Sequence, residues 1–284
     1  MESTDEGGGG GELGLGLGFA EIGAVAEGLG RSEVFHIVKE VIGFVLYMHH
    51  QIPSVLQSLE NEFLALKEEF KIWYVDSGTM PTETKASDQR KHNMRKREVK
   101  QGIKRQEKLM NGISSFLSAL QDALDELPSI QGVTLVLGGS LARPLHVYDM
   151  LFSNGRFDSG SAKECTKSKV AQTLSRKAIR ALISSGAGST STGSPCKLFL
   201  LMKCPCTFNL PLHFLPKREF HYTKKVVPFR LHIKCKAKDK AMNDQHSNTI
   251  SSSCCMSESA QTEDIWFQCR HTVKGLACKA PTEC

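Results

Sequence analysis

The sequence predicts an α+β fold in which helices pack against a largely antiparallel sheet. In the first half of the chain, apolar residues recur at three- and four-residue spacing, which is typical of amphipathic helices. In the second half, short β-branched and aliphatic runs are separated by turn residues, which is typical of strands. Because the strands largely follow the helices, an alternating βαβ arrangement is not expected.

The domain limits follow from composition. Residues 1–31 are rich in glycine and are expected to form a disordered tail. Ser32 is a good helix N-cap, so the folded domain is expected to run from 32 to 277, with a short tail at 278–284. Polar, Gly-rich or Ser-rich composition predicts three flexible loops inside the domain, at 76–97, 186–195 and 236–262.

Four helices are expected. The first begins at Ser32 and is interrupted near Pro53, which can open the second. The apolar positions from Val99 to Leu127 predict a long central helix that ends at Pro128. A further helix is expected at about 164–185. The predicted strands are Val133–Leu137, Lys197–Lys203, Glu219–Tyr222, Val226–Cys235 and Asp264–Val273.

One segment accounts for the net charge of +6. From Lys85 to Lys108 there are ten Lys or Arg residues against three acidic ones, a local excess of about +7. A solvated helix start is the favoured interpretation, and a nuclear-import signal at 90–97 is an alternative. Direct nucleic-acid binding is disfavoured, because there is a single basic cluster with no aromatic residue inside it.

No motif indicates an enzyme or a cofactor site. Gly138-Gly139-Ser140 follows a predicted strand but lacks the spacing of a phosphate-binding loop. The ten cysteines lack paired zinc-site spacing, although Cys204, Cys206, His213 and His232 are kept as a zinc alternative. No signal peptide or membrane span is apparent, so we expect an intracellular protein with reduced thiols and no resident metal.

The helix at 164–185 has two apolar faces. On a 100° helical wheel, the face around Leu174 is a credible core face, whereas Ile179 and Ile183 fall about 140° and 180° away from Leu174. Arg176 and Arg180 flank them. A second apolar face is either buried or offered to a partner, and an apolar centre with an Arg rim is typical of protein interfaces.

Several segments together resemble the comet proteins, HORMA-like binding partners of the Mad-two spindle-checkpoint protein. Asp264–Gln268, with Thr272–Gly275 close behind it, is the most specific match. The matches occur in the family order across about residues 34–277, and the others are Leu46–Pro53, Val133–Ser140, Leu174–Ile183 and Phe214–Lys217.

The resemblance implies a HORMA-like fold, with a sheet backed by three helices and a C-terminal segment that wraps like a safety belt. It also implies a non-enzymatic adaptor. The client contacts carried over by position are Met48 and Ile179, where the family often has Gln and Phe; Arg176, Arg180 and Ile183 complete the expected client surface. Pro216 and Lys217 match the family's contact with an AAA+ remodelling ATPase.

The expected function is therefore to bind the closed conformer of a Mad-type HORMA protein and present it to the ATPase, which silences the spindle checkpoint. The alternative is a meiotic chromosome-axis or synapsis factor that binds other HORMA proteins. The expected location is the nucleus and cytoplasm, with kinetochores and meiotic chromosomes as candidate sites. No membrane partner is expected.

Overall fold

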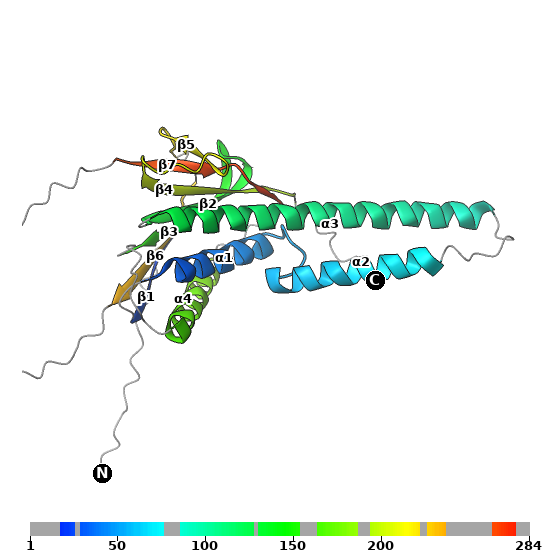
Figure 1. The fold of residues 1–284 in the computed structure, drawn as a ribbon, viewed down its shortest axis with the longest axis horizontal. Helices are drawn as coiled ribbons and strands as arrows, with labels where there is room; N and C mark the ends of the chain where they lie inside the picture. Colours follow the sequence, from blue (N-terminus) through cyan, green and yellow to red (C-terminus); the bar gives the residue numbers. More distant parts are fainter. Residues whose placement is uncertain are drawn as a thin grey trace, which may run out of the picture.

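The structure is a computed structural model that describes residues 18–25, 29–76, 86–127, 130–153, 164–186, 194–221, 226–236 and 263–276. These residues form four helices and one eight-stranded mixed sheet (Figure 1), which confirms the α+β class. The helices are α1 (Arg31–Met48), α2 (Leu56–Asp76), α3 (Ala86–Glu126) and α4 (Glu164–Ser184). The strands are β1 (Phe19–Val25), β2 (Gly132–Ser140), β3 (Arg143–Phe152), β4 (Lys197–Pro205), β5 (Phe214–Lys217), β6 (Phe229–Lys236), β7 (Asp264–Cys269) and β8 (Val273–Lys274).

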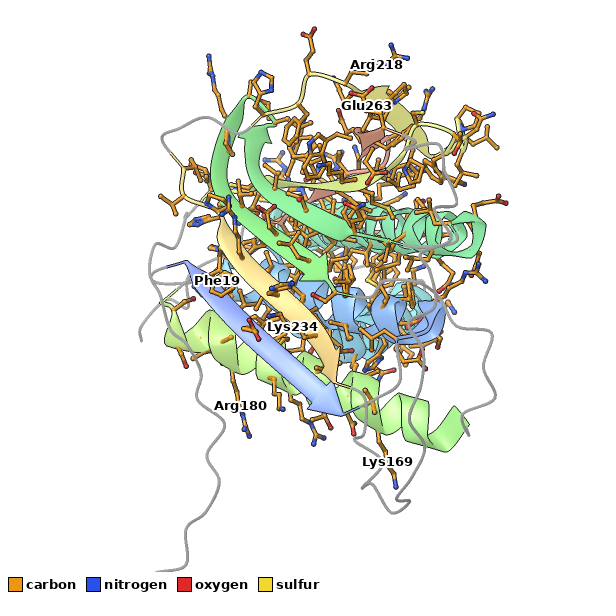
Figure 2. The ribbon with its side chains drawn as sticks, turned by 90° about the vertical axis from the view of Figure 1, so that its left-hand side faces the viewer. Phe19, Lys169, Arg180, Arg218, Lys234 and Glu263 are labelled. Carbon is orange, nitrogen blue, oxygen red and sulfur yellow. The ribbon has the colours of Figure 1, made fainter. Side chains whose placement is uncertain are left out.

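The strand order is β1-β6-β3-β2-β4-β7-β5, and β8 also pairs with β4. Both β1 and β3 run parallel to β6, whereas the other pairings are antiparallel. The sheet is therefore largely antiparallel, as expected, with a parallel part at the β1 edge. Figure 2 shows β1 beside β6 at this edge, with α4 next to them.

The main core lies between the sheet and the helices. Along β2, alternate residues such as Val133 and Leu135 pack toward α1, α3 and α4. Val136 points to the opposite face, where Phe199 and Trp266 belong to a second, smaller cluster. This alternation is the period of two that a strand imposes. Among the described helices, none combines the length and apolarity needed to cross a membrane.

The expected N-terminal tail is wrong for residues 18–25. Residues 19–25 form β1, which pairs in parallel with β6 from Phe19 opposite Arg230 to Val25 opposite Lys236. Ala20 and Ile22 are buried while Glu21 is exposed. A short strand at a sheet edge depends on its distant partner, and the surrounding glycines obscured its alternation. Residues 1–17 lie outside the described residues.

The expected loop at 76–97 is wrong for residues 86–97, because α3 already begins at Ala86. Lys, Arg, Gln and Met are strong helix formers, so an exposed helix here needs no apolar face. The Gly and Pro that suggested a loop, Gly78 and Pro81, lie outside the described residues. The second helix begins at Leu56 rather than at Pro53, because His50, with φ of 53°, starts a turn that runs to Ser54.

Several strand predictions also need correction. Within the predicted strand Glu219–Tyr222, Glu219 lies in a turn, Phe220 and His221 have no regular structure, and Tyr222 lies outside the described residues. The strand of this region is β5. The last predicted strand is interrupted between β7 and β8. Strand β3 was not predicted from the sequence, because polar residues interrupt the apolar alternation typical of a strand. One of these, Asp149, is buried and accepts a 2.7 Å hydrogen bond from the Thr134 hydroxyl. Most of the expected loops 186–195 and 236–262, and the tail 278–284, lie outside the described residues.

Gln51 joins three distant segments just after α1. Its Nε2 donates to the carbonyl of His49 at 2.7 Å and to that of Ser194 at 3.5 Å. Its Oε1 accepts from the backbone N–H of Cys196 at 2.6 Å, and its carbonyl accepts from the N–H of Leu276 at 2.9 Å. Since Gln51 is 1 % exposed, water cannot replace these bonds.

Gly275 allows the C-terminal segment to approach Gln51. A Cβ at position 275 would overlap Oε1 of Gln51 and lie 2.9 Å from its Cβ. We therefore expect Gly275→Ala to lower the free energy of unfolding by roughly 1–3 kcal/mol, as overpacking of a well-packed core does. Chemical denaturation measures this change. Gly139→Ala is the control, because a Cβ there meets nothing within 4 Å; an equal loss in both variants would contradict the expectation.

Candidate partner-binding surfaces

The core face predicted for α4 is confirmed. Leu174 lies at its centre and is fully buried, and Val170 is partly buried against the main core. The helix packs against α1 and β1. On the β1 side, Nζ of Lys177 donates to the carbonyl of Gly23 at 2.7 Å. The remaining buried core residues of the predicted face are Ala178, Ala181 and Leu182.

The opposite face of α4 presents apolar and cationic side chains together. Ile183 is 60 % exposed, an uncommon exposure for a large aliphatic residue on a helix that already buries its other face. Arg176 and Arg180 are exposed, and Figure 2 shows Arg180 pointing away from the helix. Ile179 is half-buried. The structure therefore separates the two isoleucines: Ile183 faces outward, whereas Ile179 faces a neighbouring hollow.

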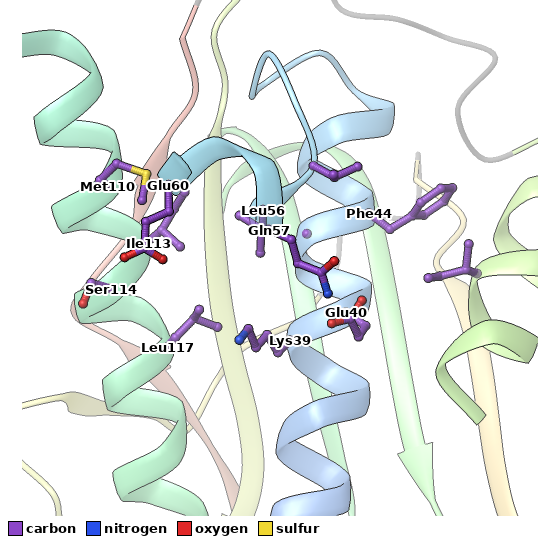
Figure 3. A pocket seen from close by; sticks show the side chains of 13 residues that line it. Lys39, Glu40, Phe44, Leu56, Gln57, Glu60, Met110, Ile113, Ser114 and Leu117 are labelled. Carbon is purple, nitrogen blue, oxygen red and sulfur yellow. The ribbon is translucent and has the colours of Figure 1, made fainter. Parts of the chain in front are cut away.

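Ile179 lines a hollow of about 660 Å³ that also involves α1, α3 and the start of α2. Its size falls in the range of sites that hold a small ligand or a few side chains of a partner. Figure 3 shows Phe44 on α1 and Leu56 on α2 beside this hollow, with Met110 on α3. Charged and polar groups complete the lining, among them Lys39, Glu40, Gln57 and Glu60. The hollow thus offers apolar contacts inside a polar rim.

Phe44 and Met110 were missed as site residues by sequence reasoning. Phe44 is half-buried beside the core face of α1, and the available sequence signal was a large aromatic residue next to the predicted apolar face rather than within it. Its meeting with Met110 depends on how α1 and α3 pack, which the sequence does not show. Gly43 permits the close approach of α2, because a Cβ there would lie 2.8 Å from a terminal methyl of Leu56.

Met48 lies at the same end of the α1–α4 pair as Ile183. Met48 is half-buried and packs against the main core. The next residue, His49, places its ring 4.1 Å from that of His146. His146 and Ser185, which follows α4, line a shared hollow. The structure therefore brings the C-terminal ends of α1 and α4 together, although Met48 offers only part of its surface.

His49 is a fully buried histidine whose ring makes one hydrogen bond. Its Nε2 lies 2.6 Å from the Tyr148 hydroxyl, while Nδ1 has no partner. Burial, and secondarily the neighbouring His146 and His50, lower the pKa of His49 to about 4. Burial also raises the pKa of Tyr148 far above its ordinary value, so its hydroxyl stays protonated. His49 is therefore neutral in the folded protein at pH 7.

Pro216 and Lys217 lie on β5, at the other edge of the sheet from β1. Both are exposed, and in the antiparallel pairing with β7 they stand opposite Phe267 and Trp266. The Trp266 ring packs edge-on against Phe220, 5.7 Å between centroids, which gives it a packing role. Pro216 and Lys217 thus lie at the opposite edge of the sheet from β1 and α4, so the two expected contact surfaces do not overlap.

The cysteines form no metal centre in the described ranges, where no group of three or more metal-ligating side chains occurs. Cys204 is buried while Cys206, two residues later, is exposed. Burial, with a smaller effect of Asp264, raises the pKa of the Cys204 thiol to about 12. Burial likewise raises that of Cys269 to about 11, although a backbone hydrogen bond from His271 opposes it. A thiol with a raised pKa is a poor nucleophile and metal ligand at neutral pH.

Comparison of the chain with protein-family models gave no match, and comparison with curated proteins gave no significant match either. The likeness to the comet proteins therefore rests on the sequence segments themselves.

The buried neutral His49 predicts a loss of stability in mild acid. The unfolded chain binds a proton near pH 6.5, whereas the folded chain does so only near pH 4, so the contribution of His49 is complete above 6.5 and declines as the pH falls to 4. Between pH 7.5 and 4.5 the free energy of unfolding should fall by about 2–3 kcal/mol more in the wild type than in His49→Asn. Urea denaturation across this range measures it, and the exposed His221→Asn controls for the loss of a histidine. Equal pH slopes in the wild type and His49→Asn would contradict the assignment.

Proposed function

We propose that this protein is a non-enzymatic adaptor that binds the closed conformer of a Mad-type HORMA protein. It presents this client to an AAA+ remodelling ATPase, and the result is silencing of the spindle checkpoint. The fold in this proposal is HORMA-like, with the segment from β7 onward as a safety-belt-like element.

The observation that carries the proposal is the outward face of α4. Ile183 exposes a large apolar surface beside the exposed Arg176 and Arg180, on a helix whose other side is packed against the core. Interfaces are built from such apolar centres with a polar rim, and Arg is enriched in them. The adjacent hollow beside Ile179 adds a place for a partner side chain.

The C-terminal segment supports the belt-like element. It leaves β7, which pairs with both β4 and β5, and continues into β8, which pairs again with β4. Beyond β8 the N–H of Gly275 donates to the carbonyl of Cys196 at 2.9 Å, and Leu276 bonds to Gln51. The segment therefore crosses from one edge of the domain to the end of α1.

The exposed Pro216–Lys217 pair supports the ATPase contact. Proline restricts the backbone torsion of its strand, and Lys217 offers a cation at the sheet edge. The position also leaves α4 free for the client, as an adaptor requires.

Ile183→Asp should weaken binding of closed Mad-two by at least about 30-fold, because it places a charge in the apolar centre of the interface. Isothermal titration calorimetry with the closed client measures the affinity. Leu212→Asp is the matched control, since Leu212 is 80 % exposed and lies away from α4. Unchanged affinity of Ile183→Asp for closed Mad-two would reject the α4 interface. If the wild-type protein bound meiotic HORMA proteins but not Mad-two, the client would be a meiotic HORMA protein instead.

Lys217→Ala should leave client binding intact and reduce ATPase-driven conversion of the client to the open form by about tenfold. The reason is the loss of one charge that the ATPase surface would pair. A conversion assay with purified ATPase, client and adaptor measures the rate. Arg218→Ala, an equally exposed neighbour, is the control. A wild-type rate with Lys217→Ala would remove this residue from the contact.

A further inference from the structure

The N-terminal half of α3 extends away from the sheet with α2 alongside it, as an arm (Figure 1). The two helices are joined across the arm by an ion pair between Lys67 and Glu107 at 3.3 Å. Val99 and Ile103 are half-buried on α3, whereas Arg97 and Lys104 are exposed. The outer side of α3 is therefore free for another molecule.

Six cations form a basic stripe on this outer side. At 100° per residue, Arg90, Arg97, Lys104 and Lys108 fall within about 40° of one another, with Lys100 and Arg105 at the flanks. All six are exposed, and no acidic residue falls inside the arc that they span. From Arg90 to Lys108 the stripe is about 27 Å long, given a rise of 1.5 Å per residue.

The stripe continues into a hollow of about 640 Å³ between α3 and the C-terminal segment. Arg105 and Lys108 line it from α3, and His271 and Lys274 line it from around β8. No Asp or Glu belongs to the lining of this hollow. Cations from two parts of the sequence that are more than 150 residues apart thus meet at the base of the stripe. Hydrogen-bonding groups of the same lining come from Asn111, Ser115 and Thr272.

We propose that the basic stripe and this hollow bind the phosphate backbone of double-stranded nucleic acid. A straight row of exposed cations fits a rigid polyanion with closely spaced charges, and such contacts require no base recognition. Between Arg90 and Lys108, Met94 is the one apolar residue inside the arc, and a protein interface would need an apolar centre there. The arc has no aromatic residue, which a single strand would need for base stacking.

This surface was disfavoured from the sequence because the basic residues form one cluster. The structure adds two observations that favour nucleic-acid binding. The cluster is an ordered helical stripe rather than a loop, and Lys274 adds a second positive element from the C-terminal segment. The proposal does not depend on the adaptor function, because the stripe lies on α3 and the client face lies on α4.

The test is fluorescence anisotropy of a labelled 25-base-pair DNA duplex with the full-length protein at 50 mM salt and above. The triple variant R97E/K104E/K108E should bind at least about tenfold more weakly than the wild type. The plot of log affinity against log salt concentration has a negative slope, and its magnitude should decrease by about 2 to 3 in this variant. Each lost phosphate contact lowers that magnitude by about 0.9. The duplex affinity of the milder variant R97Q/K104Q/K108Q should lie between those of the wild type and R97E/K104E/K108E. Circular dichroism verifies that α3 is retained in both variants.

The matched control is K169E/K203E/R218E, which makes the same change in net charge at exposed residues outside the stripe. The duplex affinity of this control variant should stay within about twofold of the wild-type affinity. Equal losses in both triple variants, or no duplex binding by the wild type at 50 mM salt, would overturn the proposal. Tighter binding of polyglutamate than of the duplex would assign the stripe to an acidic protein and overturn it as well. Client binding by R97E/K104E/K108E should be unchanged, which separates this result from the adaptor function.

Discussion

The buried Gln51 holds together the end of α1, the start of β4 and the C-terminal segment, the first two through its side-chain amide and the third through its backbone carbonyl. The amide bonds to His49 and Cys196 are buried, so losing the amide would leave buried polar groups unpaired, at about 1–3 kcal/mol for each. The position of Met48 and His49 depends on this junction, and so does the approach of Gly275. Met48, part of the proposed client surface, and the basic hollow near Lys274 thus lie on segments that Gln51 joins.

The two helices of the proposed client face, α4 and α1, differ in how much of their surface is buried. Leu174 and its neighbours bury one side of α4, which leaves Ile183 and the arginines outside. On α1 the core takes up more of the circumference, so Phe44 and Met48 are only half exposed. A partner would therefore meet α4 as a protruding face and α1 as the wall of a hollow. This asymmetry favours Ile183 over Ile179 as the more accessible contact.

Charge is also divided along the arm. Helix α2 carries several glutamates, whereas the facing half of α3 is strongly basic, and Lys67 with Glu107 joins the two. The surplus cations of α3 face the other way, toward solvent. Because like charges repel along a single helix face, such a stripe costs stability unless an anion neutralises it. The arm is thus a second surface, and the partner proposed for it differs in chemistry from the partner proposed for α4.

The sequence by itself determined the faces of the helices, because contacts between neighbouring turns repeat within a few residues. The buried side of α4, the long α3 and the buried core of β2 could all be predicted in this way. The sequence could not place β1, β3 or β5 correctly, because strands such as Phe19–Val25 are selected by a distant partner, here β6. Only the tertiary structure brought Ile179 to the hollow with Phe44 and Met110, and Lys274 to Lys108. These meetings depend on how whole elements pack, and packing is decided by contacts between residues far apart in the chain.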